Sequence, residues 1–286
     1  MRFSTVVLDF DGTVTRVEEV AAAFLKEYRA GLSAATGRDL SAAWDRNLAF
    51  VHTFAPQLAW KWGGWEVCPA APDPYIAAST AAELTLEEAG LLSEWAALPG
   101  TLYAQLYPQL AAPFRAETAE VLAALVGTGA RVCFVSNAST GKIAARLDTL
   151  LPAEVRKRVE VVGDAGKFLV REATASGPMR ARFDALPVAL PLPGLHRPAL
   201  PRRGRYFDAL QRLWGDDEKG PENTIVCGDI FELDHSFPAA MGASVHLIER
   251  AEPYPTFPYE LQAVAALGDR GGRSPDLWGL LPRVGL

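Results

Sequence analysis

Lysine, histidine and cysteine are scarce in this 286-residue chain, and no apolar run is long enough to cross a membrane. The chain has 4 His and 3 Cys, and only 6 of its 28 basic residues are Lys. Its formal net charge is −6, so no general attraction to nucleic acid or to an anionic membrane surface is expected. No stretch approaches the ~18 apolar residues of a membrane span. The first residues become charged too soon for a signal peptide.

The three cysteines contain no CxxC pair. Cys133 and Cys227 lie inside apolar, strand-like runs, where a small thiol packs well, and Cys68 stands alone. This usage predicts reduced core residues and therefore a cytoplasmic protein.

Short apolar runs rich in β-branched residues are the main structural signal. Apolar and polar residues do not alternate within these runs, which is typical of strands buried on both faces of a parallel sheet. These runs are residues 5–8, 131–135, 159–162, 224–227 and 244–248. Between most of them lie amphipathic helical patterns, at 117–125, 142–150 and 206–214. Strands alternating with helices predict a Rossmann-like, three-layer α/β core with an open parallel sheet.

A long insertion separates the first of these strands from the second. Residues 17–114 contain no convincing buried strand, and helical patterns at 18–32, 41–53 and 85–98 are broken by Gly and Pro clusters. We therefore predict a helical domain over 17–114, inserted into a core of residues 1–16 and 115–286. The tail after residue 251 indicates turns and two short helices, at 259–267 and 275–281.

The insertion holds five of the seven tryptophans, and a proline-rich segment follows later in the core. Core packing is the favoured interpretation of the tryptophans, because large aromatic side chains dominate cores. The alternative is a pocket-facing loop at Trp60, Trp62 and Trp65, beside two glycines. Residues 187–201 contain five prolines and cannot form regular helix or central strand, and their role stays open.

Two carboxylates, Asp9 and Asp11, directly follow the first strand in the sequence DFDGT. They would lie at the carboxyl end of a parallel strand, where open α/β sheets bind ligands. Because side chains alternate along extended backbone, both would leave the strand on the same side. For this pattern alone, an ordinary acidic turn with Gly12 at positive φ is the alternative.

Two further strand ends carry polar groups. Ser136 and Asn137 follow the strand 131–135 and precede a helix start, which suits phosphate oxygens, although ordinary helix capping is the alternative. The strand 224–227 is followed by GDIFELD, which supplies Asp229 and Asp234. Together the three strand ends predict phosphoryl and metal chemistry at one edge of the sheet.

These motifs occur in the order found in the haloacid dehalogenase-like (HAD) superfamily, which the chain resembles. The resemblance covers residues 5–15 and about 121–248, and the insertion looks like the helical C1 cap of that superfamily. It implies a Mg²⁺-dependent phosphatase that hydrolyses a small phosphorylated metabolite through an aspartyl-phosphate. Asp9 would be the nucleophile, and Asp11 would be the general acid and base.

The resemblance also implies a metal site formed by Asp9, Asp11, Asp229 and Asp234. Two carboxylates ~4 Å apart repel each other by about 4 kcal/mol at an effective dielectric of ~20, so convergent acids require a cation. Oxygen ligands without nearby His or Cys favour a hard ion such as Mg²⁺.

Phosphate binding would involve the Ser136 hydroxyl, Asn137 and a cationic side chain. No Lys stands shortly before the helix that precedes the last motif, where the superfamily most often has one. Arg203 is the best match there, and Arg can bind phosphate through two hydrogen bonds. The alternatives are Arg202, Arg205, Arg197 and Lys167.

Other functions remain open on this scaffold. Asp11 argues against dehalogenation, because a departing halide needs no proton. A phosphomutase, or a non-catalytic binding protein with a retained HAD-like core, is the alternative to a phosphatase. The substrate and the oligomeric state are not predicted.

Overall fold

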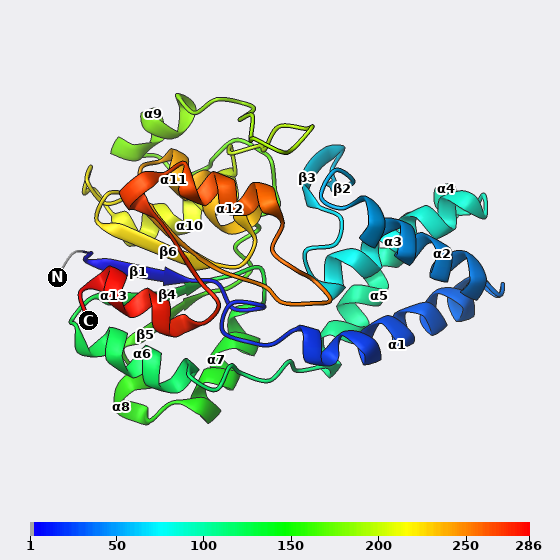
Figure 1. Ribbon diagram of the computed structural model, residues 1–286, viewed down its shortest axis with the longest axis horizontal. Helices are drawn as coiled ribbons and strands as arrows, with labels where there is room; N and C mark the ends of the chain where they lie inside the picture. Colours follow the sequence, from blue (N-terminus) through cyan, green and yellow to red (C-terminus); the bar gives the residue numbers. More distant parts are fainter. Residues whose placement is uncertain (1–2) are drawn as a thin grey trace. The chain divides into compact units, whose positions relative to one another are not determined.

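The computed structural model describes residues 3–286, and the chain divides into two compact units (Figure 1). Unit 1 contains the chain up to Thr15, Phe114–Ala251 and Thr256–Leu286. Unit 2 contains Arg16–Pro113 together with Glu252–Pro255. Residues 252–255, which the sequence assigns to the core, are therefore grouped with the insertion. As a result the chain passes between the two units at four places.

Unit 1 is built on a six-stranded sheet in the order β5-β4-β1-β6-β7-β8, and each neighbouring pair runs parallel. The strands are β1 (Thr5–Leu8), β4 (Arg131–Val135), β5 (Val159–Val162), β6 (Thr224–Gly228), β7 (Ser244–Ile248) and β8 (Gly271–Ser274). All five strands expected from the sequence are present. The sixth, β8, was not expected, because its sequence GGRS has no apolar run to mark it.

Helices cover both faces of this sheet, which confirms the three-layer α/β core (Figure 1). One face carries α6 (Thr118–Gly127), α7 (Thr140–Leu150) and α8 (Ala153–Arg156). The other face carries α10 (Gly204–Trp214), α11 (Ser236–Ala240) and α12 (Pro258–Ala265). The remaining elements are α9 (Pro178–Asp184), α13 (Leu281–Val284), short 3₁₀ turns at Gly268–Arg270 and Leu277–Leu280, and a π-helical turn at Phe231–His235.

Side chains alternate along the strands, so each face of the sheet contributes its own side chains to the packing against the helices. Val7 and Val226 belong to one buried cluster with Tyr206, Phe207 and Leu210, which recur at helical spacing along α10. All of these side chains are buried. The central strand β1 is buried over its whole length, which anchors the residues that directly follow its carboxyl end.

Unit 2 is mainly helical, with a hairpin that the sequence did not predict. Its elements are α1 (Glu18–Thr36), α2 (Ser41–Phe54), β2 (Ala59–Trp62), β3 (Trp65–Pro69), α3 (Pro74–Glu88), α4 (Leu92–Trp95), α5 (Leu98–Leu106) and a 3₁₀ turn at Tyr107–Gln109. The single helix expected over 85–98 is wrong. Helix α3 begins earlier, at Pro74, where the Asp73 carboxylate accepts a hydrogen bond from Ile76 N–H at the first turn.

The tryptophans of unit 2 divide between core and surface. Trp44 is buried and stacks on Tyr28 with ring centroids 5.6 Å apart. Trp62 and Trp65 flank the turn of the β2–β3 hairpin and remain 44% and 46% exposed. Core packing therefore explains Trp44 and the buried Trp60, whereas Trp62 and Trp65 lie partly at the surface.

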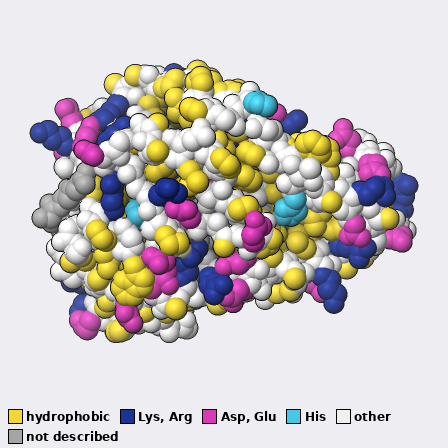
Figure 2. Space-filling view, viewed as in Figure 1, with side chains coloured by type: hydrophobic (Ala, Val, Ile, Leu, Met, Phe, Trp, Pro, Cys, Tyr) yellow, Lys and Arg dark blue, Asp and Glu magenta, His cyan; other side chains and the backbone are white. Residues whose placement is uncertain are grey.

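The surface carries both signs of charge. On the face seen in Figure 2, acidic and basic side chains are interspersed, and no large area of one sign is visible. Among residues 3–286, no helix combines the length and the apolar composition of a membrane span.

Candidate active site

The end of β1 places Asp9 and Asp11 beside each other. The Asp9 N–H donates to Cys227 O at 2.9 Å, which extends the β1–β6 ladder up to the acid. Phe10 points the other way and is fully buried, with its ring edge-on to Phe114 and Phe134. Asp9 is 8% exposed and Asp11 is half-buried, and the charge of Asp11 acts on Asp9.

The turn after these acids is shaped by contact with Asp229. Gly12 has φ +80°, and a Cβ at this position would lie 2.4 Å from Asp229 Oδ2. The Thr13 hydroxyl donates to Asp229 Oδ1 at 3.2 Å. Glycine is therefore required both by the backbone conformation and by space. Thr13 has a role that the sequence did not reveal, since it orients an acid 216 residues away.

The chain after β6 folds back on itself and brings Asp234 beside Asp229. Asp234 Oδ2 accepts hydrogen bonds from Asp229 N–H at 3.1 Å and from Ile230 N–H at 2.9 Å. The turn is a single π-helical turn, a rare form that often occurs at functional sites. Gly228 makes this return possible, because a Cβ there would lie 2.4 Å from Asp234 Cβ.

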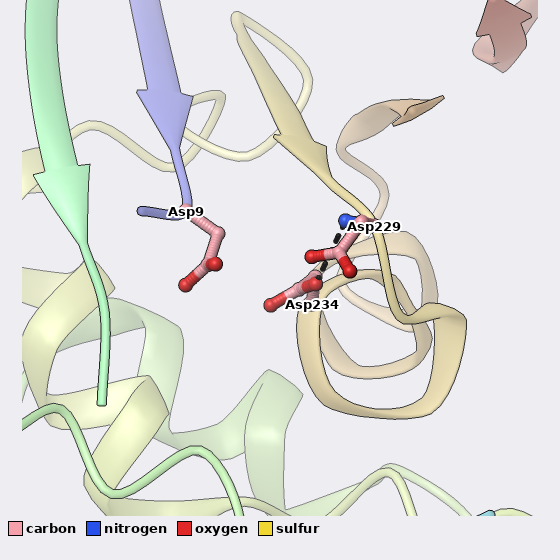
Figure 3. A group of neighbouring side chains, drawn as sticks. All are labelled: Asp9, Asp229 and Asp234. Carbon is pink, nitrogen blue, oxygen red and sulfur yellow. Dashed lines mark hydrogen bonds between the residues drawn. The ribbon is translucent and has the colours of Figure 1, made fainter. Parts of the chain in front are cut away.

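Three of the predicted acids form one buried cluster. Carboxylate oxygens of Asp9, Asp229 and Asp234 all lie within 4.8 Å of one another. Figure 3 shows their carboxyl groups gathered beyond the ends of β1 and β6. Asp11 is not a member of this cluster, although its charge acts on Asp9. The structure therefore groups three of the four predicted metal-site acids and leaves Asp11 to one side.

The cation in the cluster is Lys167, not Arg203. Lys167 Nζ donates to Asp9 Oδ1 at 2.7 Å and to Asp234 Oδ1 at 2.8 Å, and the side chain is 1% exposed. Arg203 is also buried, but its Nε donates to Leu200 O and its Nη1 to Phe168 O. These two contacts of Arg203 lie outside the acid cluster, and its role in phosphate binding stays a prediction. The Arg203 guanidinium binds the Leu200 and Phe168 carbonyls, whereas Lys167 supplies the ammonium at the acid cluster.

The other arginines considered for this role also have different partners. Arg202 donates to the carbonyls of Leu186 and Asp184, and Arg197 pairs with Glu232. Arg205 is exposed. A sequence signal for Lys167 did exist, because it follows β5 by five residues and thus belongs to a fourth strand end at the same sheet edge.

Ser136 and Asn137 follow β4, the strand next to β1. Ser136 is buried, and its hydroxyl accepts a hydrogen bond from Ala138 N–H at 3.3 Å. Asn137 Oδ1 accepts from Lys167 N–H at 2.8 Å. Asn137 therefore holds the backbone of the residue whose ammonium reaches Asp9. The Ser139 hydroxyl caps α7 by accepting a hydrogen bond from Lys142 N–H, so ordinary helix capping does occur in this segment.

The charges in the cluster perturb one another. Burial raises the pKa of Asp9 to about 7; Lys167 opposes this rise, while Asp234 and Asp11 add to it. Burial acts in the same sense on Asp234, but Lys167 and the hydrogen bond from Ile230 N–H outweigh it and hold the pKa of Asp234 below its ordinary value. An electrostatic contribution from His235 also lowers the pKa of Asp234, and Asp234 accepts backbone hydrogen bonds on its second oxygen.

Lys167 stays charged in spite of its burial. Desolvation lowers the pKa of Lys167, but the carboxylates of Asp234 and Asp9 outweigh it and hold the pKa above its ordinary value. One ammonium then faces three carboxylates. The donor set consists of carboxylate oxygens, so the cluster fits a hard divalent cation such as Mg²⁺, which would balance the remaining charge.

No protein-family model matches the sequence, and no curated protein matches it. Solved structures do match over the full length. A predicted phosphoglycolate phosphatase from Haemophilus somnus is 14% identical, with 99% of each chain covered and a TM-score of 0.52. The putative HAD-hydrolase YfnB from Bacillus subtilis, bound to magnesium, is 12% identical, with 100% of each chain covered and a TM-score of 0.51.

An L-2-haloacid dehalogenase from Xanthobacter autotrophicus is 15% identical, with 99% of this chain and 100% of that chain covered, at a TM-score of 0.46. The similar structures thus include proteins described as phosphatases and others described as dehalogenases. The two structures with TM-scores of 0.52 and 0.51 share their architecture with this chain, and the acidic strand ends of this chain lie where open α/β sheets bind ligands. The chain therefore has the haloacid dehalogenase-like fold.

Proposed function

We propose that this protein is a Mg²⁺-dependent phosphatase that hydrolyses a small phosphorylated metabolite, with Asp9 as the nucleophile. The observation that carries the proposal is the buried cluster of Asp9, Asp229 and Asp234 with the Lys167 ammonium on Asp9. Such a cluster is costly unless cations offset its negative charge, and a divalent ion beside Lys167 would do so. Its location beyond the ends of β1 and β6 supports the same conclusion.

Each residue near the cluster has a step that it can perform. The Asp9 carboxylate attacks phosphorus and forms an aspartyl-phosphate, while Asp11 donates a proton to the leaving oxygen. Asp11 then takes a proton from the water that cleaves the intermediate, which restores both acids. Lys167 holds one oxygen of Asp9 and offers positive charge to the phosphoryl group.

The metal would be held by Asp9 and Asp229, with Asp234 behind them. Asp234 already accepts hydrogen bonds on both oxygens, so its main part is to orient Asp229 and Lys167. Bound Mg²⁺ would supply the positive charge that offsets the acids and draws phosphate oxygens toward Asp9. The Ser136 hydroxyl, at the neighbouring strand end, is our candidate for a further phosphate contact.

Asp11 separates a phosphatase from a haloacid dehalogenase. Release of an alkoxide is helped by a proton donor, whereas release of a halide is not.

Unit 2 would act as the specificity domain, because the HAD-like core itself carries the general chemistry. The three cysteines are buried, and none forms a disulfide within residues 3–286, which fits the proposed cytoplasmic location.

The test is hydrolysis of p-nitrophenyl phosphate and of a panel of phosphorylated metabolites, with Mg²⁺ and with EDTA. We expect Mg²⁺-dependent turnover that falls to background in Asp9→Asn. Asp11→Asn should lower turnover by ~10²- to 10⁴-fold, because it removes general acid and base catalysis. Release of halide from 2-haloacids, without phosphate release from any ester, would overturn the proposal.

A further inference from the structure

The proline-rich segment 187–201 contains a buried arginine, Arg197, that reaches the active-site turn. The segment has no regular helix, but Leu190 and Ala199 exchange backbone hydrogen bonds of 2.8 and 2.9 Å, which close it into a loop. Within this loop Arg197 is only 8% exposed. A long irregular segment that buries a charge needs a partner for that charge.

That partner is Glu232, and the pair is bidentate. Arg197 Nη1 donates to Glu232 Oε2 and Nη2 to Oε1, both at 2.7 Å. The two side chains are 7% and 0% exposed. The Tyr259 hydroxyl adds a third hydrogen bond to Glu232 Oε1 at 2.9 Å. Two parallel hydrogen bonds fix direction as well as distance, which a single ammonium contact would not.

Glu232 lies in the turn between Asp229 and Asp234. Its carboxylate is not part of the acid cluster and instead binds Arg197 and Tyr259, which hold the turn through Glu232. Because the turn is only five peptide bonds long from Asp229 to Asp234, a shift of Glu232 must move one of the two acids.

A second buried pair, Arg250 and Glu260, also contacts this turn. Glu260 Oε1 accepts from Phe231 N–H at 2.9 Å, and Glu260 Oε2 pairs with Arg250 at 2.5 Å. Arg250 also donates to the Asp229 carbonyl. The turn is therefore restrained at Asp229, Phe231 and Glu232 by groups that do not belong to the acid cluster.

We propose that the proline-rich segment is a positioning element for the metal site, in which Arg197, through Glu232, fixes the Asp229–Asp234 turn in its cation-binding form. The proposal rests on the metal site of the proposed function. A buried ion pair contributes little net stability, because desolvation offsets its attraction. Its distinctive effect is geometric, and hydrogen-bond partners behind metal ligands typically change metal affinity by ~10- to 100-fold.

The test is Mg²⁺ affinity, measured by calorimetric titration with Mg²⁺ alone on the folded full-length chain. Arg197→Met should weaken Mg²⁺ binding by ~10- to 100-fold, as loss of a group behind the ligands does. Arg197→Lys should recover part of the affinity, because it keeps the positive charge but not the two parallel hydrogen bonds of the guanidinium. The matched control is Arg202→Met, which removes hydrogen bonds to the Leu186 and Asp184 carbonyls near the same segment. It should leave Mg²⁺ affinity unchanged.

Equal Mg²⁺ affinity in Arg197→Met and Arg202→Met would overturn the proposal and leave Arg197 a purely structural residue. If Arg197→Met does not fold, Arg197→Lys decides, and unchanged Mg²⁺ affinity there would have the same meaning. Absence of Mg²⁺ binding by the unsubstituted protein would overturn this inference together with the proposed metal. Mg²⁺ binding without turnover of any phosphate ester would instead count against the phosphatase alone.

Discussion

At the scale of single residues, the site depends on one buried ammonium. Lys167 contacts Asp9 and Asp234, which lie 158 and 67 residues away in the chain. Its ammonium also lies 5.3 Å from the centre of the Tyr206 ring, and the Tyr206 hydroxyl donates to the Asp234 carbonyl. Removal of Lys167 would leave buried carboxylates uncompensated, which is strongly destabilising.

We expect Lys167→Met to abolish most turnover and to lower the free energy of unfolding in EDTA by roughly 3–5 kcal/mol, the usual cost of breaking a buried pair. Mg²⁺ should recover part of that stability, because it supplies charge to the same acids. Activity on p-nitrophenyl phosphate and urea denaturation with and without Mg²⁺ measure the two effects.

Arg203→Met is the comparison for this substitution. It removes hydrogen bonds to the Leu200 and Phe168 carbonyls, so it should destabilise the protein while the folded fraction keeps its kcat/KM. A larger loss of kcat/KM in Arg203→Met than in Lys167→Met would show that Arg203, not Lys167, serves the phosphate.

At the scale of elements, the site is made by the residues that come after four parallel strands. The strands β5, β4, β1 and β6 are neighbours in the sheet, and they are followed by Lys167, Ser136, Asp9 and Asp229. Their carboxyl ends share one edge, so groups from four distant parts of the sequence meet there. The tight return after β6 depends on Gly228, which has Asp234 packed directly against its Cα.

We predict that Gly228→Ala weakens Mg²⁺ binding at least ~10-fold, the scale seen when the support of a metal ligand is disturbed. The added methyl would lie 2.4 Å from Asp234 Cβ and 2.6 Å from its Cγ and Oδ2, so the Asp234 carboxylate must move off its backbone donors. Calorimetric titration with Mg²⁺ is the measurement.

Gly127→Ala is the matched control for Gly228→Ala, because no atom lies within 4 Å of a Cβ at that helical position. It should leave Mg²⁺ affinity unchanged and stabilise the protein slightly, since alanine loses less backbone entropy than glycine in a helix. Equal Mg²⁺ affinity in both variants would contradict the role given to Gly228.

At the scale of the whole molecule, the core contains two buried, uncharged histidines. Burial lowers the pKa of His246 to about 3 and that of His235 to about 4. His246 Nε2 is 2.7 Å from the Ser274 hydroxyl, which ties β7 to β8. An unfolded histidine titrates near ~6.5, so between pH ~6.5 and ~3 the unfolded chain binds more protons than the folded one. Stability is therefore complete above this window and is lost as the pH falls through it.

The histidine substitution His246→Gln should make the protein less sensitive to acid. From pH 6.5 to 5, the unsubstituted protein should lose about 1–2 kcal/mol more stability than the variant, as a single group contributes up to ~1.4 kcal/mol per pH unit. Urea denaturation midpoints over this range are the measurement, and His196→Gln, at an exposed histidine, is the control. An unchanged pH dependence in His246→Gln would refute the assignment.

Local sequence was sufficient for much of the core. Continuous apolar runs identified five of the six strands, because strands buried on both faces carry no polar positions. Asp9, Asp229 and Asp234 could be predicted to meet because they directly follow strands of one parallel sheet. The hairpin β2–β3 and the strand β8 were missed, because exposed tryptophans and the sequence GGRS give no buried-strand pattern.

The identity of the cation was decided only by the tertiary structure. Arg203 and Lys167 are both buried basic residues next to glycine, and nothing local tells which one reaches Asp9. The same holds for the pairing of Arg197 with Glu232 and for residues 252–255, which are grouped with unit 2. Sequence by itself determined which acids follow which strands, since that depends on neighbours along the chain. Tertiary structure decided which distant charges pair, because burial forces each charge to find a partner that chain order does not specify.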